Sequence, residues 1–407
     1  MRTGYQTIGS CLFCRFLDFK SSVTVQCQSM SMLLHACVAQ TGYAMNFSDI
    51  SKGSITAPCG VSHFHEFRPA EKVVGPFRVW ELTDDRNWAY NYHWKRPTPD
   101  LNPVGCYNVR NLVVTRPGSN ILNTNLVYDC ATGFDNQRSI PQEDDYFLQS
   151  QKNKIVIDEP VVIGDGVSFD VWGHWLIDYL PRFAVAKATI GEQFSKTKIL
   201  LPHSSPQWVY RFLEFALDVR RENIINYNPG SDIVLCREAI LPSYCYTNEF
   251  SFHSFVRDFY TSLTPSSGSE KKTRKILVSR SDFLHSNRQL SRRALFEEMA
   301  LERGYEIIHP EKFSLEEQIR IFSEAAAVVG EHGSGMHSTL FSSPGTVVGC
   351  LGFWNAVQLH IGYLMGHQNV YVTRNCKWPT PENNQYRIEC TEEDLKSFFE
   401  KVDSLIH

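Results

Sequence analysis

The sequence predicts an α/β protein in which two Rossmann-like domains face each other across a cleft. Strand-like and helix-like segments alternate in two separate runs, and such alternation is typical of parallel sheets with covering helices. A polar segment with proline and glycine, residues 264–273, separates the two runs and predicts a linker. In the second run a strand leads through glycines into a helix, the kind of junction at which these sheets bind ligands.

The first run belongs to a predicted N-terminal domain, residues 45–263. Residues 45–150 are rich in Tyr, Trp, Asn, Pro and Gly, which predicts short strands and loops. Beyond them, short apolar and β-branched segments predict strands at 154–163, 198–201, 223–227 and 233–241. Helical spacing of apolar residues predicts helices at 172–188, 206–216 and 250–263. The second of these helices is predicted to be capped by Ser205, with Pro206 at its first position.

The second run forms a predicted C-terminal domain, residues 274–390. Its apolar segments predict strands at 275–279, 305–309, 325–329, 346–351 and 369–372. Helices are predicted at 291–303, at 314–326 and from residue 336 onward, after the glycines. Ser314 and Glu317 form a capping box for the second helix, and Thr391 with Asp394 caps a terminal helix at 391–407.

Composition describes an ordinary globular protein and excludes several classes. The 407 residues are 43% hydrophobic, enough for a large core, and the net charge of −4 without a basic face argues against nucleic-acid binding. No run approaches the ~18 apolar residues of a membrane-spanning helix. Residues 1–44 lack the pattern of a signal peptide and predict a poorly structured extension. We therefore expect a cytoplasmic protein that works near a membrane surface.

The twelve cysteines are scattered along the chain. Cys11-x-x-Cys14 has no second close pair, so no zinc site is expected. Cys236 and Cys350 lie in apolar segments, where a reduced cysteine behaves as a small core residue. This indicates a reducing compartment, although the even count leaves disulfides open.

The most informative segment is Glu331-His332-Gly333-Ser334-Gly335, which follows an apolar strand and precedes a helix. Glycines let backbone N–H groups approach a ligand closely, and a helix N-terminus carries partial positive charge. A phosphate or diphosphate is the expected ligand. The alternative is a tight strand-to-helix turn with no ligand.

Arginines follow the first strand of the C-terminal domain. Arg280 comes directly after the strand, on the edge of the sheet where ligands bind, and Arg288 follows closely. The guanidinium fork suits phosphate oxygens, so these residues and the glycine segment together predict a diphosphate site. For Arg292 and Arg293 we favour solvated charges on a helix surface.

His174 and Asp178 are four residues apart on a predicted helix and therefore share one face. One interpretation is a general base, in which one side chain tunes the other and removes a proton from an acceptor hydroxyl. The other is a buried pair that only stabilises the helix. Arg182 is predicted to pair with Asp178 across one turn.

The absence of several motifs excludes some classes of enzyme. The sequence has no Asp-x-Asp, no Gly-x-Ser-x-Gly and no Gly-Lys-Ser/Thr. It therefore predicts neither a serine hydrolase nor a P-loop NTPase, and neither a metal nor a cofactor is expected.

Four motifs follow one another: His174-Trp175-x-x-Asp178-x-Leu180-Pro181-Arg182, Val278-Ser279-Arg280, Phe313-Ser314-Leu315-x-x-Gln318 and Gly330-x-His332-Gly333-Ser334-Gly335. In order and approximate spacing they resemble glycosyltransferase family 61, a group of inverting enzymes that includes capsular-polysaccharide and xylan-decorating transferases. The resemblance covers roughly residues 155–352. Each motif alone is unspecific, whereas four in the right order are fairly specific.

The resemblance implies a GT-B architecture, with the acceptor side N-terminal and the nucleotide-sugar side C-terminal. It implies His174 or Asp178 as the base, and Gln318 or Glu317 beside the nucleotide. The predicted donor site comprises Arg280, Arg288, Gln318, His332, Gly333, Ser334 and Gly335.

The implied activity is transfer of a hexose or pentose from a nucleoside-diphosphate sugar to a glycan or lipid-linked acceptor, without a metal, in polysaccharide or glycan assembly. Two alternatives stay open: a non-catalytic nucleotide-sugar- or glycan-binding protein on the same fold, and an epimerase with GT-B architecture.

Overall fold

The structure, a computed structural model, describes residues 45–46, 61–72, 79–82, 100–122, 125–128, 150–246, 251–265, 272–282, 288–352, 356–374, 376–377 and 386–406. The predicted extension at 1–44 lies outside the described residues, as does the middle of the predicted linker, 266–271. Ala44–His407 form one compact unit.

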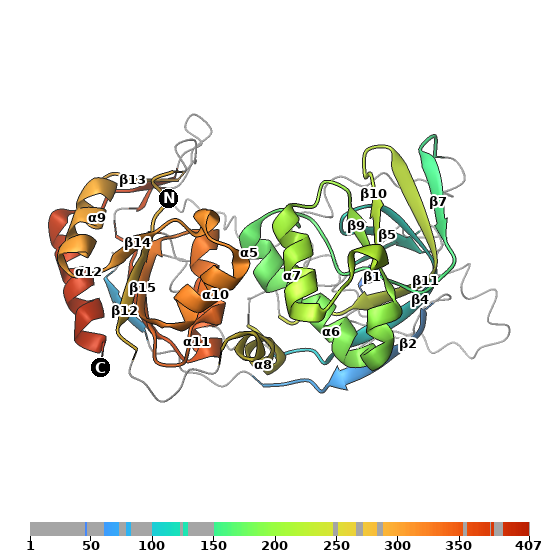
Figure 1. The fold of residues 1–407 in the computed structure, drawn as a ribbon, viewed down its shortest axis with the longest axis horizontal. Helices are drawn as coiled ribbons and strands as arrows, with labels where there is room; N and C mark the ends of the chain where they lie inside the picture. Colours follow the sequence, from blue (N-terminus) through green and yellow to red (C-terminus); the bar gives the residue numbers. More distant parts are fainter. Residues whose placement is uncertain are drawn as a thin grey trace, which may run out of the picture. The chain divides into compact units, whose positions relative to one another are not determined.

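The C-terminal half is built on a parallel sheet with helices on both faces. Its strands lie in the order β14 (Glu306–Ile308), β12 (Arg274–Val278), β15 (Ala325–Glu331), β16 (Val347–Leu351), β17 (Gln368–Val372) and β3 (Val79–Leu82). Figure 1 shows α9 (Arg293–Glu302) and α12 (Glu392–Leu405) on one side of this sheet, and α10 (Leu315–Ser323) and α11 (Ala356–Met365) on the other. Burial on both faces explains why its strands are continuous apolar runs rather than alternating ones.

The edge strand of this sheet comes from a distant part of the sequence. β3 pairs in parallel with β17, with Val79 opposite Asn369 and Leu82 opposite Val372. The side chain of Trp80 packs against the hydrophobic cluster of the C-terminal half. The predicted N-terminal domain therefore contributes a strand to the C-terminal sheet.

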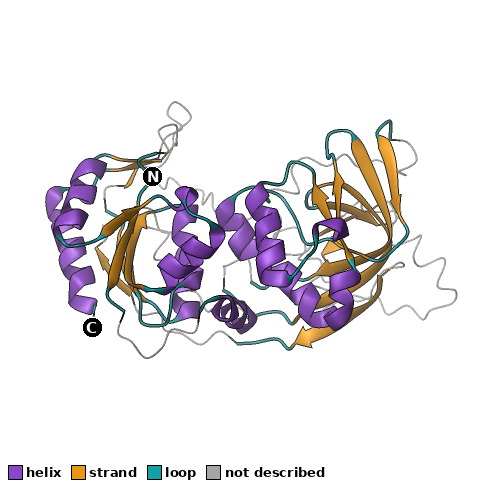
Figure 2. Ribbon diagram, viewed as in Figure 1, coloured by secondary structure: helices purple, strands orange, loops and turns teal. Residues whose placement is uncertain are grey.

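The N-terminal half holds a mixed sheet (Figure 2). Its main path runs β1 (Met45–Asn46), β6 (Asn125–Tyr128), β5 (Ser119–Leu122), β4 (Val104–Arg116), β11 (Asp232–Pro242), β8 (Val161–Val162), β9 (Lys198–Pro202) and β10 (Ile224–Tyr227). β2 (Val61–Arg68) pairs with β4, and β7 (Asn153–Ile157) pairs with β11.

A Rossmann-like arrangement describes only part of this mixed sheet. Strands β8 to β10 and β11 run parallel, whereas β4 is antiparallel to β11, β2 and β5. The tight turn between β4 and β5, with Gly118 at φ 71°, explains one of these antiparallel pairs, because a parallel crossover needs a much longer connection. The α/β class is confirmed.

The helices agree with most predicted segments. The segment predicted at 172–188 consists of α5 (Trp172–His174), a π-helical turn η3 (Trp175–Tyr179) and α6 (Leu180–Ile190). The other elements of this half are η4 (Gly191–Lys196), α7 (Gln207–Leu217), η5 (Arg221–Asn223) and α8 (Ser254–Leu263). In the C-terminal half they are η6 (Pro310–Lys312), η7 (Ser334–Phe341) and a small sheet of β13 (Arg288–Leu290), β19 (Tyr386–Ile388) and β18 (Cys376–Lys377).

The predicted start of the helix at Ser205 and Pro206 is wrong, whereas the caps predicted for two other helices are confirmed. Pro206 is the N-cap residue of α7 rather than its first helical residue, and Ser205 does not cap the helix because its hydroxyl donates to Pro202 O at 2.7 Å. The segment after the glycines is helical, as predicted, and is of the 3₁₀ type, η7. The capping box of α10 and the cap of α12 are both present.

A shared core joins helices of the two halves. One hydrophobic cluster includes residues of α6, α7 and α8 together with residues of α10, η7 and α11. Within it the ring of Tyr260 on α8 lies 5.2 Å from that of Phe341 on η7, and the Tyr260 hydroxyl donates to Leu176 O at 2.5 Å. Through this cluster the core fixes η3 relative to η7.

Cys236 and Cys350 are buried thiols, as predicted, and burial raises the pKa of each to about 12. In the part of the chain that the structure describes, no helix has both the length and the apolar character needed to cross a membrane.

Candidate active site

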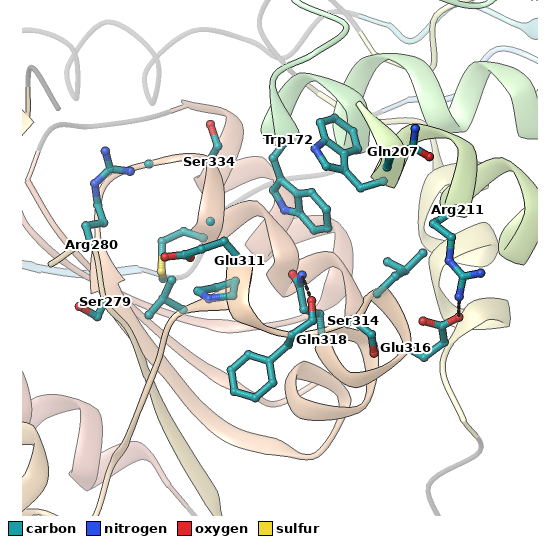
Figure 3. Close-up of a pocket in the computed structure, with 18 of the residues that line it drawn as sticks. Trp172, Gln207, Arg211, Ser279, Arg280, Glu311, Ser314, Glu316, Gln318 and Ser334 are labelled. Atoms are coloured by element: carbon teal, nitrogen blue, oxygen red, sulfur yellow. Dashed lines mark hydrogen bonds and ion pairs between the residues drawn. The ribbon is translucent and has the colours of Figure 1, made fainter. Parts of the chain in front are cut away.

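A pocket of about 540 Å³ lies at the carboxyl ends of β12 and β15 (Figure 3). Val278 of β12 pairs with Gly330 of β15, so the residues that follow both strands leave the sheet at the same edge. Arg280, Gly333 and Ser334 line the pocket from this edge. Helices α7 and α10 form further walls, which places the pocket at the ligand-binding edge of the parallel sheet.

The glycine segment and the arginines meet, as the sequence predicted. A Cβ placed on Gly333 would lie 2.5 Å from Arg280 Nη1 and 3.5 Å from Arg288 Nη1. The absence of a side chain at Gly333 thus lets two guanidinium groups approach the loop backbone. This concentration of donors is what a diphosphate requires.

Arg293 lies in this region, contrary to our prediction of a solvated charge. Its Nε and Nη2 lie 2.6 and 2.9 Å from the two carboxylate oxygens of Glu331, a buried residue at the end of β15. This hydrogen bonding raises the pKa of Arg293. A buried carboxylate needs such a partner, which explains why α9 places an arginine here. Arg292 is exposed, as predicted.

The balance of charge favours an anion. Burial lowers the pKa of Arg280, and nearby Glu331 and Glu311 oppose that shift. Arginine nevertheless stays protonated in proteins. Three guanidinium groups, those of Arg280, Arg288 and Arg293, therefore face two carboxylates, and the cluster keeps a net positive charge next to the glycine loop.

His332 is neutral at physiological pH. Burial, together with the positive charges nearby, lowers the pKa of its imidazole well below the usual value. Its backbone N–H donates to Leu351 O at 2.8 Å, which holds the start of the glycine loop against β16. Although His332 stands in the predicted donor site, its side chain does not line the pocket.

Gln318 lines the pocket and Glu317 does not. Glu317 belongs to the capping box of α10, where its carboxylate accepts a hydrogen bond from Ser314 N at 2.8 Å. The Gln318 amide nitrogen donates to Phe313 O at 3.3 Å, while its buried carbonyl oxygen has no hydrogen-bond partner among the described residues. Of the two predicted nucleotide contacts, Gln318 is the one that can accept a hydrogen bond from a ligand.

The start of α5 is docked onto η7. Trp172 Nε1 donates to Ser338 Oγ at 2.9 Å. A Cβ on Gly173 would lie 2.6 Å from His337 Cδ2 and 3.0 Å from Ser334 Oγ, so only glycine allows this approach. The helix that carries His174 and Asp178 is therefore held against the segment that carries the glycine loop.

His174 and Asp178 form the predicted pair. His174 Nδ1 lies 2.7 Å from Asp178 Oδ2, and the side chains are 48% and 7% exposed respectively. A π-helical turn, η3, begins directly after His174 and contains Asp178. Turns of this kind recur at functional sites. The imidazole faces outward and the carboxylate is buried behind it.

Arg182 does not pair with Asp178. Its Nε donates to Pro242 O at 2.9 Å, and its Nη1 donates to the carbonyls of Gly164 and Asp165, both at 3.2 Å. The guanidinium also lies 4.2 Å from the centre of the Tyr244 ring. Arg182 therefore ties α6 to the ends of β8 and β11 and is a structural residue.

Several residues that line the pocket were not predicted as site residues, among them Trp208, Phe313 and Glu311. Trp208 and Phe313 give it aromatic walls, and Trp172 packs edge-on against Trp208 at 5.5 Å between ring centres. Glu311 adds a carboxylate on the C-terminal side, as Figure 3 shows. Trp208 could have been noted as a large aromatic in the first turn of a predicted helix, whereas nothing in the sequence marks Glu311.

Substituting Gly333 with alanine tests the loop. Because its φ of 165° is ordinary extended backbone, the fold should persist, and the new Cβ should displace the end of Arg280. We expect affinity for a nucleoside diphosphate to fall by ~10-fold, about 1.4 kcal/mol, in calorimetry, with an unchanged melting temperature. Gly230→Ala, in the turn between β10 and β11, is the control. Equal affinity for Gly333→Ala and wild type would contradict this arrangement of loop and arginine.

The fold and the pocket are those of an α/β protein whose site lies at the carboxyl ends of parallel strands. Residues 172–349 match the family described as glycosyltransferase 61. This match supports membership of the chain in glycosyltransferase family 61 and, with it, a glycosyltransferase activity. All of the predicted site residues fall within the matched segment. No curated protein matches the chain.

Proposed function

We propose that the protein transfers a sugar from a nucleoside-diphosphate sugar to an acceptor hydroxyl with inversion at the anomeric carbon, within a GT-B architecture. The observation that carries this proposal is the docking of α5 onto η7. It brings an imidazole–carboxylate pair next to a glycine loop that two guanidinium groups approach. Anion-binding groups and a base on opposite sides of one site are what in-line displacement of a diphosphate needs.

The exposed fractions of the two side chains favour His174 as the base. Its half-exposed imidazole can reach an acceptor hydroxyl, whereas the buried Asp178 carboxylate can accept a hydrogen bond from Nδ1 and orient the ring. On taking the proton, the imidazolium is stabilised by the carboxylate at 2.7 Å. In this assignment His174 is the base and Asp178 is a positioning residue.

The leaving diphosphate is stabilised by Arg280, Arg288 and the backbone of Gly333, Ser334 and Gly335. Charge-assisted hydrogen bonds from guanidinium groups and amides offset the negative charge that develops as the glycosidic bond breaks. The nucleoside occupies the pocket beside Phe313 and Gln318, whose side-chain oxygen accepts from the base or ribose. A glycan acceptor enters along α7, past Trp208 and Arg211.

A screen of nucleoside-diphosphate sugars that detects release of the nucleotide tests the proposal. We expect release from one donor class, faster with acceptor present, and a new glycosidic linkage of inverted configuration in the product. Binding without release from any donor would support a non-catalytic protein instead. A changed donor sugar with no glycosidic product would support an epimerase.

Turnover is expected to survive EDTA. Among the described residues, one group could hold a metal ion, Asp282, His309 and Glu311, whose ligand atoms lie within 4.8 Å of one another. Lys312 Nζ already lies 2.6 Å from Asp282 Oδ2 and supplies positive charge there. The guanidinium groups at the glycine loop can stabilise the negative charge of the diphosphate in place of a metal ion.

The measurement is turnover of the wild type and of Glu311→Gln, each with and without chelator. We expect EDTA to leave both unchanged. Loss of wild-type turnover with EDTA, restored by manganese, would contradict metal independence. If EDTA then had no such effect on Glu311→Gln, the metal would be located at the group of Asp282, His309 and Glu311.

A further inference from the structure

His337 stands between the two parts of the site. It is a buried residue of η7, three positions after Ser334. The Cδ2 edge of its ring faces Gly173, directly before His174. Burial lowers the pKa of the His337 imidazole to about 4, and the charges of His174 and Arg288 act in the same direction. The ring is therefore neutral at physiological pH.

A chain of hydrogen bonds fixes which nitrogen of this ring carries the proton. Thr339 Oγ1 lies 2.8 Å from Met336 O, and only the hydroxyl can donate there. The same hydroxyl oxygen therefore accepts from Gln358 Nε2 at 2.9 Å. This orients the amide so that Gln358 Oε1 faces His337 Nδ1 at 2.9 Å.

An amide oxygen can only accept, so Nδ1 of His337 must be the protonated nitrogen. Because the ring is neutral, Nε2 then has a bare lone pair. Nε2 is bonded to Cδ2 and so lies on the edge of the ring that faces α5. Among the described residues, only Nδ1 of this ring has a hydrogen-bond partner.

We propose that His337 Nε2 accepts a hydrogen bond from a hydroxyl of the transferred sugar, and that Gln358 and Thr339 are positioning residues that hold the ring in the accepting tautomer. The proposal rests on the proposed function. In a displacement the sugar lies between the leaving diphosphate and the base. His337 lies on η7, three residues after Ser334 of the glycine loop, and its ring faces Gly173, directly before His174. A fixed acceptor at this place discriminates between sugars by the presence of one hydroxyl.

The tautomer can be measured without substrate. In protein labelled with ¹⁵N-histidine, NMR should show His337 neutral and protonated at Nδ1, and Gln358→Leu should reduce the fraction of this form. Gln358→Glu keeps an acceptor opposite Nδ1 and should retain it. A wild-type ring protonated at Nε2 would overturn the proposal whatever donor the enzyme uses.

The contact itself is tested with monodeoxy analogues of the donor found in the release screen. For the wild type we expect one analogue to lose ~10-fold or more in kcat/KM, because the lone pair of Nε2 would be left buried and unpaired. His337→Asn keeps an amide N–H near the position of Nδ1 but removes the Nε2 acceptor. For this variant the same analogue and the parent donor should react almost equally.

His337→Gln, whose amide oxygen can approach the position of Nε2, should restore part of the discrimination. Equal penalties for the deoxy analogues in wild type and His337→Asn would overturn the contact. Failure of the wild type to release nucleotide from any donor would instead overturn the function on which the proposal rests.

Discussion

Asp178→Asn is expected to lower turnover by ~100-fold or more, the scale of general-base catalysis, while the melting temperature stays near that of the wild type. Asparagine preserves the size of the side chain and an oxygen that can accept from His174 Nδ1, now 2.7 Å from the carboxylate. It removes the charge that stabilises the imidazolium formed when His174 takes the proton of the acceptor. Donor affinity should be unchanged, because neither side chain lines the pocket.

Turnover per folded molecule and melting temperature are measured on the same purified variants. Asp170→Asn, which changes an exposed carboxylate shortly before α5, is the matched control and should alter neither quantity. If the pair of His174 and Asp178 only stabilises the helix, the melting temperature should change and turnover should not. Asp178→Asn would then melt at a clearly lower temperature and keep most of its turnover, and the assignment of a base to this helix would be wrong.

Arg280→Ala is expected to weaken binding of the released nucleoside diphosphate by about 1.5–3 kcal/mol, or roughly 10- to 150-fold in Kd, as for a charge-assisted hydrogen bond. Arg280 lines the pocket at the glycine loop. Arg280→Lys retains the charge but loses the two-pronged geometry, so it should fall between alanine and wild type. The measurement is titration calorimetry.

Arg292→Ala serves as the control for overall charge, since Arg292 is exposed and precedes α9. It should bind the nucleotide as the wild type does. An Arg280→Ala variant with wild-type affinity would mean that the diphosphate does not contact this residue, and the donor site would have to be placed elsewhere.

The sequence predicted best where one local pattern decides the structure. The apolar strands of the C-terminal sheet, the caps at Ser314 and Thr391, and the pairing of His174 with Asp178 all follow from spacing within a few residues. The meeting of Arg280 with Gly333 was predictable because parallel strands end at one edge.

Features that depend on distant partners could not be predicted in this way. β3 has four residues, too few for a periodic signal, and its place depends on the edge of β17. Arg293 looked like a surface charge because its partner, Glu331, lies 38 positions away. Arg182 was predicted to pair with the nearest carboxylate in sequence, that of Asp178, whereas its guanidinium donates hydrogen bonds to backbone carbonyls at strand ends. In each case tertiary contacts outweigh the local pattern.

The position of β3 also has a consequence for how the chain is made. Its partner β17 is synthesised about 290 residues later, which at roughly 5–20 residues per second is a delay of about 15–60 s. Throughout that interval β3 has no strand to join, and once β17 emerges its exposed edge can pair with any extended segment nearby. The C-terminal sheet can therefore be completed only after nearly the whole chain has left the ribosome. Folding in the cell should depend on protection of residues 79–82 during translation.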